Sequence, residues 1–308
     1  MSVPNKRLVR SASSGPVELE RSYAWCRSLC RRTAGNFYFS FLTLPPDRLR
    51  DMYVLYAFMR VSDDLGDDDR LPNAERATKL KRWRMMLQRA LDGDGFQHEL
   101  FPALSEVVSR YHLPHEYLHA VLDGVEMDLN SSGFETFDDL SQYCYRVAGV
   151  VGLCCIHIWG FHDERANDRA IDCGLAFQLT NILRDLSEDA ALGRIYLPRE
   201  DLRRFGYSGD DIVAQQLDER FVQLMRFEVD RARSYYRRAW ELFDNLEPPG
   251  RPIYRAMLQT YGGLLDRIEQ SGYDVYSRRI KLPKWRKVFI SVDAIVRERW
   301  FGRMKVEG

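Results

Sequence analysis

Residues 178–189 read QLTNILRDLSED, and an oxygen-bearing side chain recurs there at every fourth position, at Asn181, Asp185 and Asp189. On an α-helix, residues four apart share one face and lie about 6 Å apart along the axis. Leucine and isoleucine side chains surround the three positions, which favours a buried helix. Carboxylates that face the interior are costly unless a cation offsets their charge. The stretch therefore predicts a helix that presents metal ligands to the inside of the molecule.

A second acidic row lies in residues 56–67, which read YAFMRVSDDLGD, with Asp63 and Asp67 again four apart. A single such pair is usually a solvated surface feature, but two rows set in apolar helices call for a function. Mg²⁺ takes oxygen ligands and is commonly shared with substrate phosphates. An arginine accompanies each row, Arg60 in the first and Arg184 in the second, and guanidinium groups suit bidentate contacts with diphosphate oxygens. We therefore expect the two rows to face each other around Mg²⁺ ions and a diphosphate.

Outward from these rows, helical periodicity dominates the chain and strand-like alternation is scarce. Glycine and proline positions separate the periodic segments. We expect one all-α domain over 17–308, folded around a central cavity, after a disordered basic tail over 1–16. The pattern predicts helices over 17–33, 46–64, 73–92, 99–111, 115–130, 137–160, 164–190, 217–245, 250–272 and 283–302.

The composition excludes several classes of protein. Lys plus Arg equals Asp plus Glu at 45 each, so the chain lacks the basic excess of a nucleic-acid binder. The six cysteines form no CxxC pair and have no histidine cluster at zinc spacing, which predicts buried, reduced thiols in a cytoplasmic protein. The longest apolar run, over 147–160, is too short to span a bilayer, so we expect no membrane anchor.

The two acidic stretches, with a third, carry a resemblance to a known family. YAFMRVSDDLGDD at 56–68, YCYRVAGVVG at 143–152 and QLTNILRDLSEDAALGRIYLP at 178–198 resemble the squalene/phytoene synthase family of head-to-head prenyl synthases. The similarity extends over nearly the whole chain, and the third stretch is highly specific. It implies an all-α isoprenoid-synthase fold in which two aspartate-rich helices face each other across a central cavity.

The resemblance also implies roles for individual residues. The metal ligands would be Asp63, Asp67, Asn181, Asp185 and Asp189, which would bind Mg²⁺, or Mn²⁺, around the substrate diphosphate. The same four aspartates, with Tyr143 and Tyr261, would form the catalytic set. Substrate would also contact Arg60, Tyr56, Gln178, Arg184 and Arg278. Gly66 stands where the family often has a larger apolar residue, and a glycine there is expected to end the helix early and loosen Asp67.

The implied reaction joins two prenyl diphosphates through a cyclopropyl diphosphate intermediate. Phe41 and Tyr53 match positions at the floor of the pocket for the prenyl tail. Two bulky rings favour the shorter substrate, because each isoprene unit needs volume that a packed core does not leave. We therefore expect farnesyl diphosphate and a C30 product of the presqualene diphosphate or squalene type. The alternative is a phytoene synthase that acts on geranylgeranyl diphosphate to give a C40 product.

Reduction to squalene would require a nicotinamide hydride, and the sequence has no GxGxxG after a strand. Because some squalene synthases bind nicotinamide without that module, the use of NADPH stays open. Two rival classes also stay open: a terpene cyclase that acts on one substrate, and a non-catalytic relative that serves as a scaffold. The ordered string over 181–198 argues against the cyclase, and the survival of all five metal ligands argues against the scaffold.

The C-terminal stretch over 284–303 is basic and carries apolar residues at helical spacing, including Trp285, Phe289 and Trp300. A final packing helix is the more common role for such a pattern. Peripheral contact with a membrane is the alternative, because the implied substrates and product are lipophilic. Downstream enzymes of isoprenoid synthesis would then be candidate partners.

Overall fold

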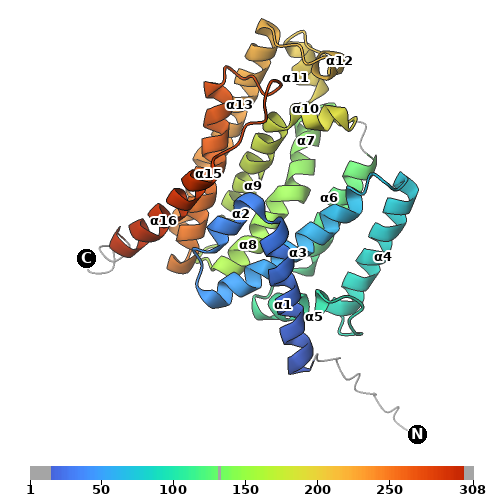
Figure 1. The fold of residues 1–308 in the computed structure, drawn as a ribbon, viewed down its shortest axis with the longest axis vertical. Helices are drawn as coiled ribbons and strands as arrows, with labels where there is room; N and C mark the ends of the chain where they lie inside the picture. The colour runs from blue at the N-terminus through green and yellow to red at the C-terminus, as the bar shows by residue number, and fades with distance from the viewer. Residues whose placement is uncertain (1–14, 131–132, 302–308) are drawn as a thin grey trace.

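The computed structural model describes residues 15–130 and 133–301. Residues 1–14 of the tail predicted over 1–16 therefore lie outside the described residues. Within those ranges the chain forms helices and no β-strand, which confirms the predicted all-α fold. Figure 1 shows the long helices lying beside one another, with α4 at one edge and α16 at the opposite edge. The elements are α1 (Pro16–Thr33), α2 (Gly35–Phe41), α3 (Pro46–Gly66), α4 (Asn73–Leu91), α5 (Phe101–Arg110), α6 (His115–Asn130), α7 (Phe137–Cys144), the π-helical turn η1 (Tyr145–Gly149), α8 (Val150–Trp159), α9 (Arg165–Arg184), α10 (Leu186–Ala191), α11 (Arg199–Arg204), α12 (Gly209–Val213), α13 (Glu219–Ala239), α14 (Leu242–Asn245), the 3₁₀ turn η2 (Pro248–Gly250), α15 (Arg251–Gln270) and α16 (Lys284–Phe301).

Local sequence explains where several of these helices begin and end. Pro46 opens α3, a position where its missing N–H has no helical partner to lose. Thr136 and Ser208 form capping boxes before α7 and α12, each with an aspartate three residues on. Glycines at the predicted breaks, among them Gly93 and Gly160, adopt positive φ, which side chains other than glycine rarely tolerate.

Three predicted helices are interrupted. The π-helical turn η1 divides the helix expected over 137–160 into α7 and α8. The helix expected over 164–190 stops at Arg184, because Asp185 leaves helical geometry with φ −103° and ψ 18°, and α10 continues the chain. The helix expected over 217–245 divides into α13 and α14. Both acidic rows thus lie at helix ends.

Helix α9 lies at the centre of the bundle, where it packs against α13, α8, η1 and α15. Close approach to η1 depends on Gly174, since a Cβ there would lie 2.4 Å from the carbonyl oxygen of Ala148. Gly152 makes a similar approach possible between α8 and Ala170. These glycines hold the helix with the second acidic row firmly against its neighbours.

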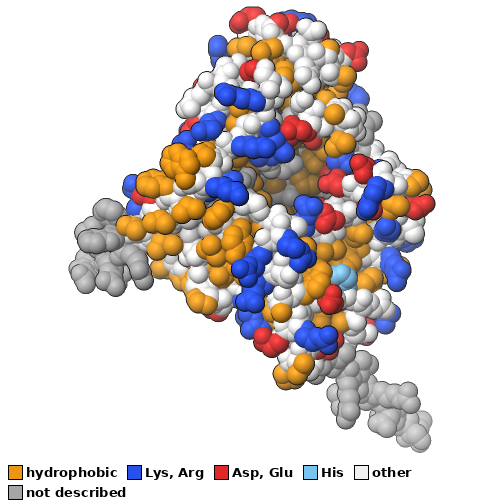
Figure 2. All heavy atoms as spheres, viewed as in Figure 1, with side chains coloured by type: hydrophobic (Ala, Val, Ile, Leu, Met, Phe, Trp, Pro, Cys, Tyr) orange, Lys and Arg blue, Asp and Glu red, His pale blue; other side chains and the backbone are white. Residues whose placement is uncertain are grey.

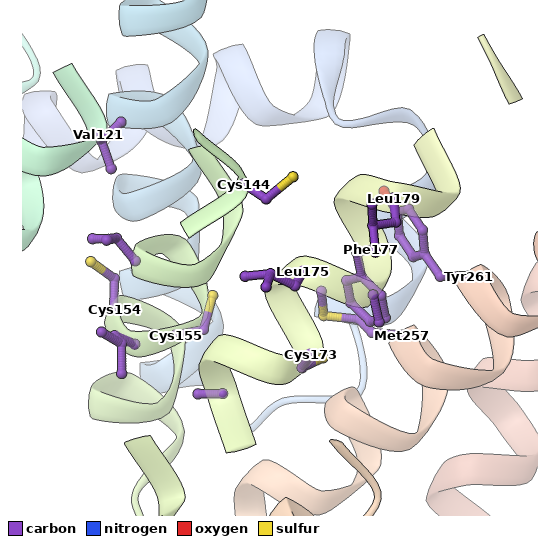
Figure 3. Packing of buried hydrophobic residues seen from close by; sticks show 14 of the residues in the cluster. Val121, Cys144, Cys154, Cys155, Cys173, Leu175, Phe177, Leu179, Met257 and Tyr261 are labelled. Carbon is purple, nitrogen blue, oxygen red and sulfur yellow. The ribbon is translucent and has the colours of Figure 1, made fainter. Parts of the chain in front are cut away.

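All six cysteines are free and buried, as the sequence predicts. Figure 3 shows four of them, Cys144, Cys154, Cys155 and Cys173, among aromatic and aliphatic side chains of the core. Burial raises the pKa of Cys155 to about 12, and the pKa of Cys26 and Cys30 to about 12 as well. These thiols are therefore protonated packing groups and not nucleophiles.

The apolar run over 147–160 contributes to η1 and α8 in this core. Among the described residues, no helix combines the length and the apolar character that crossing a bilayer requires.

Candidate active site

A cavity of about 470 Å³ opens between α2, α3, α6, α8, α9 and α15. Apolar side chains, including Phe41, Leu55 and Phe177, line most of it. Its polar wall includes residues from both acidic segments: Arg60, Asp63, Gln178, Asn181 and Arg184. Figure 2 shows the hollow near the centre of the molecule, with acidic and basic side chains beside it. The structure therefore brings the two predicted acidic segments together at one apolar cavity.

The first acidic row sits at the end of α3. Asp63 faces the cavity, and its side chain is in contact with solvent there. Desolvation by the surrounding protein, together with the negative charge of the nearby Asp67, raises the pKa of Asp63 to about 7. Helix α3 ends at Gly66 as expected, and Asp67 is its C-cap residue with a side chain 63% exposed. The Asp67 carboxylate pairs with Arg194, at 3.1 Å between Oδ1 and Nη1.

The second acidic row spans the break between α9 and α10. Asp185 accepts hydrogen bonds from Arg184 and is also 3.0 Å from Nη2 of Arg279. Burial and the neighbouring Asp185 raise the pKa of Asp189 to about 7. Arg194, which pairs with the first row, also lies near enough to Asp189 to oppose that rise. The guanidinium of Arg194 thus connects the two rows.

Arg60 lines the cavity and pairs with Asp64 at 2.5 Å, one turn further along α3. The Asp64 side chain is about half exposed and lies outside the cavity lining. The Nε atom of Arg60 is buried and has no hydrogen-bond partner among the described residues. A buried guanidinium N–H without an acceptor fits a site that receives an anion.

Two of the predicted tyrosines line the cavity. The hydroxyl of Tyr56 donates to Oγ1 of Thr33 at 3.1 Å. Tyr261 stacks on Phe177 with ring centroids 4.3 Å apart, and burial raises the pKa of its hydroxyl. Its hydroxyl also hydrogen-bonds Asn181, so an aromatic wall adjoins the second row.

Six predicted residues lie outside the cavity lining: Asp67, Asp185 and Asp189 of the acidic rows, and three others. Tyr143 is buried outside the cavity, where its hydroxyl donates to Asp128 at 3.0 Å. Tyr53 is also buried but absent from the cavity lining, because its side chain turns toward Tyr38 in α2 and hydrogen-bonds it. Arg278 is exposed, and its neighbour Arg279 reaches Asp185 instead.

Sequence reasoning missed four residues of this region: Asp128, Arg194, Tyr196 and Arg279. The half-buried Asp128 accepts from Tyr143 and Tyr196, at 3.0 and 2.9 Å, and burial raises its pKa despite both donors. Arg194 and Tyr196 stand in the family-like string over 178–198 and could have been singled out there. Asp128 and Arg279 carry no comparable signal, since only the fold brings them to the site.

The side chains present suit a divalent cation. Both rows consist of carboxylate and amide oxygens, the donors that Mg²⁺ and Mn²⁺ prefer. Among the residues that the structure describes, however, no three acidic, histidine or cysteine side chains approach closely enough to form a ready-made metal site. The arrangement is consistent with metal that is held jointly by protein and diphosphate.

A mostly apolar cavity with acidic helices and arginines at one wall is the arrangement of an all-α isoprenoid synthase, a class of enzyme that ionises prenyl diphosphates. Comparison with known proteins agrees: the family described as "Squalene/phytoene synthase" matches residues 30–286. The chain belongs to the squalene/phytoene synthase family and is a prenyltransferase.

Relatives and solved structures extend this result. The chain is 36% identical to the 15-cis-phytoene synthase of Synechococcus elongatus, over 88% of this chain and 92% of the relative. It is 34% identical to the phytoene synthase of Arthrospira platensis, over 92% and 96%. A dehydrosqualene synthase crystal structure superposes with a TM-score of 0.83 at 29% identity, covering 90% of this chain and 96% of that one. The squalene synthase of Alicyclobacillus acidocaldarius gives 0.78 at 30% identity, covering 86% and 99%.

Proposed function

We propose that this prenyltransferase condenses two molecules of geranylgeranyl diphosphate head to head, in a magnesium-dependent reaction that yields phytoene. The expectation of a C30 product rested on two rings at the pocket floor, and only Phe41 lines the cavity. Relatives named phytoene synthase, at 34–36% identity over about nine-tenths of the chain, favour the C40 alternative. Phe41 and the two C30 synthase structures favour the C30 product, which we keep as the second candidate.

The observation that carries the proposal is the meeting of a mostly apolar cavity with two acidic segments and two arginines. We propose that Mg²⁺ is held by Asp63, Asp67, Asn181, Asp185 and Asp189. When bound, the metal would neutralise charge on the departing diphosphate as the allylic C–O bond breaks. Mn²⁺ prefers the same oxygen donors and would serve in its place.

The protein side chains have complementary tasks. Arg60 and Arg184, both at the cavity wall, bind diphosphate oxygens and keep them at the polar end. Arg184 and Arg279 now pair with Asp185, so binding of metal and diphosphate would transfer these guanidiniums from the carboxylate to phosphate. The apolar lining excludes water from the allylic cation. The stacked rings of Phe177 and Tyr261 place π-electron density beside that cation.

Conversion to phytoene requires proton loss and no reductant, so the proposed activity is independent of NADPH. The test is to supply the purified chain with Mg²⁺ and either geranylgeranyl or farnesyl diphosphate, without nicotinamide, and to identify the hydrocarbons by mass spectrometry. We expect phytoene from the C20 substrate, at a kcat/KM above that for the C15 substrate.

Other outcomes would replace the proposal. Faster turnover of farnesyl diphosphate, with a C30 product, would establish the second candidate. A C15 or C20 hydrocarbon made from one substrate molecule would identify a terpene cyclase. Absence of diphosphate release from either substrate would identify a non-catalytic scaffold.

A further inference from the structure

Helix α16 presents an apolar face that no described residue covers. Trp285 is 71% exposed and Phe289 65% exposed, and Val288, Val292 and Val296 are between 44% and 53% exposed. At 100° per residue these five side chains fall within one arc of about 100° on the helix. The opposite side of α16 carries Ile290 and Ala294, which pack against Ala256 of α15. The predicted packing helix is therefore present, and it also presents an apolar face to solvent.

This face differs from isolated exposed apolar residues, which are normal on soluble proteins. Its members are contiguous, and they include a tryptophan and a phenylalanine, side chains that favour the boundary between lipid and water. The exposed part of Trp240, at the end of α13, lines the groove between α13, α15 and α16 together with Phe289. The apolar surface thus extends beyond one helix.

Cations border the apolar face. Residues 278–297 carry seven Lys or Arg side chains and a single Asp, although the whole chain has as many acidic as basic residues. In the adjoining groove, Arg233 and Arg297 are paired with carboxylates. Arg237 and Arg286 line the same groove and form no ion pair within the described part of the chain. An unneutralised basic margin around an apolar face is complementary to an anionic lipid surface.

The position of α16 connects this face to the cavity. Helix α16 packs against α2, and α2 supplies Gly35, Phe37 and Phe41 to the cavity lining. Leu42, directly after α2, is 46% exposed. Figure 2 shows hydrophobic side chains gathered over α16 on the same face of the molecule as the central hollow. A surface that rested on α16 would lie near the entrance used by a prenyl chain.

We propose that the exposed face of α16, with the arginines of the adjoining groove, docks the enzyme on an anionic phospholipid bilayer. The helix would lie parallel to the membrane, with Trp285 and Phe289 among the acyl chains and Arg237 and Arg286 at the lipid phosphates. This docking extends the proposed function, because prenyl diphosphates and the hydrocarbon product would reach and leave the cavity through the lipid phase. The membrane itself, and not a free phosphate, is the ligand.

The test is flotation of the full chain with vesicles of phosphatidylcholine, with and without phosphatidylglycerol. We expect binding to the anionic vesicles and its loss in high salt, where screening acts within about 3 Å. The double variant Trp285→Ser/Phe289→Ser should weaken vesicle binding by about tenfold or more. Substitution of both groove arginines, Arg237→Gln/Arg286→Gln, should remove the preference for phosphatidylglycerol.

A matched control is Met85→Ser/Val213→Ser, which removes two apolar side chains that are 55% and 60% exposed on α4 and α12. This control should bind vesicles as the unmodified chain does. The proposal would be overturned if the Trp285→Ser/Phe289→Ser variant bound vesicles as well as this control, or if the unmodified chain bound no vesicles at all. Light scattering tests whether the face instead binds a second copy of the chain. That assignment would follow if the unmodified chain were a dimer that does not bind vesicles, and if the Trp285→Ser/Phe289→Ser variant were a monomer.

Catalysis is measured separately, with detergent-dispersed substrate. The serine variants should retain full turnover under those conditions, since neither residue lines the cavity. An active enzyme that ignores vesicles would refute the docking surface alone. A chain that binds vesicles and turns over no prenyl diphosphate would refute the proposed function alone.

Discussion

Gly66 shows how one residue both permits packing and shapes the acidic wall. A Cβ at this position would lie 2.6 Å from Cγ1 of Val125, so only glycine lets α3 approach α6 this closely. Because α3 stops there, Asp67 is released from the helix and can reach Arg194. A larger residue at this position would separate the helices and remove Asp67 from the other acidic row.

The first prediction concerns the acidic rows. Asp63→Ala or Asp185→Ala should lower kcat by about 10³-fold or more, because several kcal/mol of metal-assisted charge stabilisation would be lost. Stability to urea should not fall for Asp63→Ala, since its desolvated carboxylate gains nothing from the fold without metal. Asp230→Ala, an exposed aspartate on α13, is the control and should retain full activity. Near-normal turnover by Asp63→Ala would refute the metal assignment.

The second prediction distinguishes the roles of Phe41 and Tyr53, the two rings that the sequence places at the pocket floor. Phe41→Ala enlarges the cavity and should shift the kcat/KM ratio toward geranylgeranyl over farnesyl diphosphate by about tenfold. Tyr53→Ala should leave that ratio unchanged, because the ring lies outside the cavity lining, and should cost about 3 kcal/mol of unfolding free energy. Steady-state kinetics with both substrates measures the ratio. A shift of equal size in Tyr53→Ala would place that ring at the pocket after all.

At the scale of helices, the sequence predicts the long elements well, because 3.6-residue periodicity and proline or glycine boundaries are local properties. It does not predict the π-turn η1 or the break at Asp185, since the apolar helical periodicity continues through both positions. Both irregularities lie beside the cavity, where packing and site geometry override local preference. Short helices such as α11 and α12 were also missed, because six or fewer residues show no periodicity.

The third prediction tests the close packing of α9 on η1. Gly174→Ala should cost about 1–3 kcal/mol or more, since the new methyl group would meet backbone atoms of Ala148 and Gly149 that cannot rotate away. Activity should fall as well, because the same helix carries Asn181. Gly262→Ala on α15 is the matched control: its Cβ meets nothing within 4 Å, so stability should rise by about 0.5–1 kcal/mol. Urea unfolding gives both values, and equal stabilities would contradict the packing argument.

At the scale of the molecule, the site is assembled from helices far apart in the sequence. The spacing of the acidic residues predicts which side chains share a helix face, and the resemblance predicts that the two rows meet. Neither predicts that Arg194 would link the rows, or that Asp128 would accept two tyrosine hydroxyls behind them. Those contacts depend on how α3, α6, α7 and the segment after α10 are arranged in space, which no single segment encodes.

The fourth prediction uses this assembly as a whole. Mg²⁺ together with inorganic diphosphate should bridge α3 and α9 and raise the melting temperature by about 5 °C at ligand concentrations near 100 Kd. Either component alone should give a smaller rise, because each completes only part of the coordination. Differential scanning calorimetry measures the shift, and EDTA should reverse it. A full shift in the Asp185→Ala variant would contradict a shared metal site.

Burial of every native thiol has a practical consequence for spectroscopy. All six cysteines are buried, and burial raises their pKa, so maleimide reagents should react with them only slowly at neutral pH, including Cys155 and Cys173 at the cavity wall. A single cysteine introduced at an exposed site such as Asp230 would then take up a spin label or fluorophore selectively. The mobility and solvent contact of that site could then be recorded in solution from the otherwise unaltered polypeptide, with no cysteine-free background to build first.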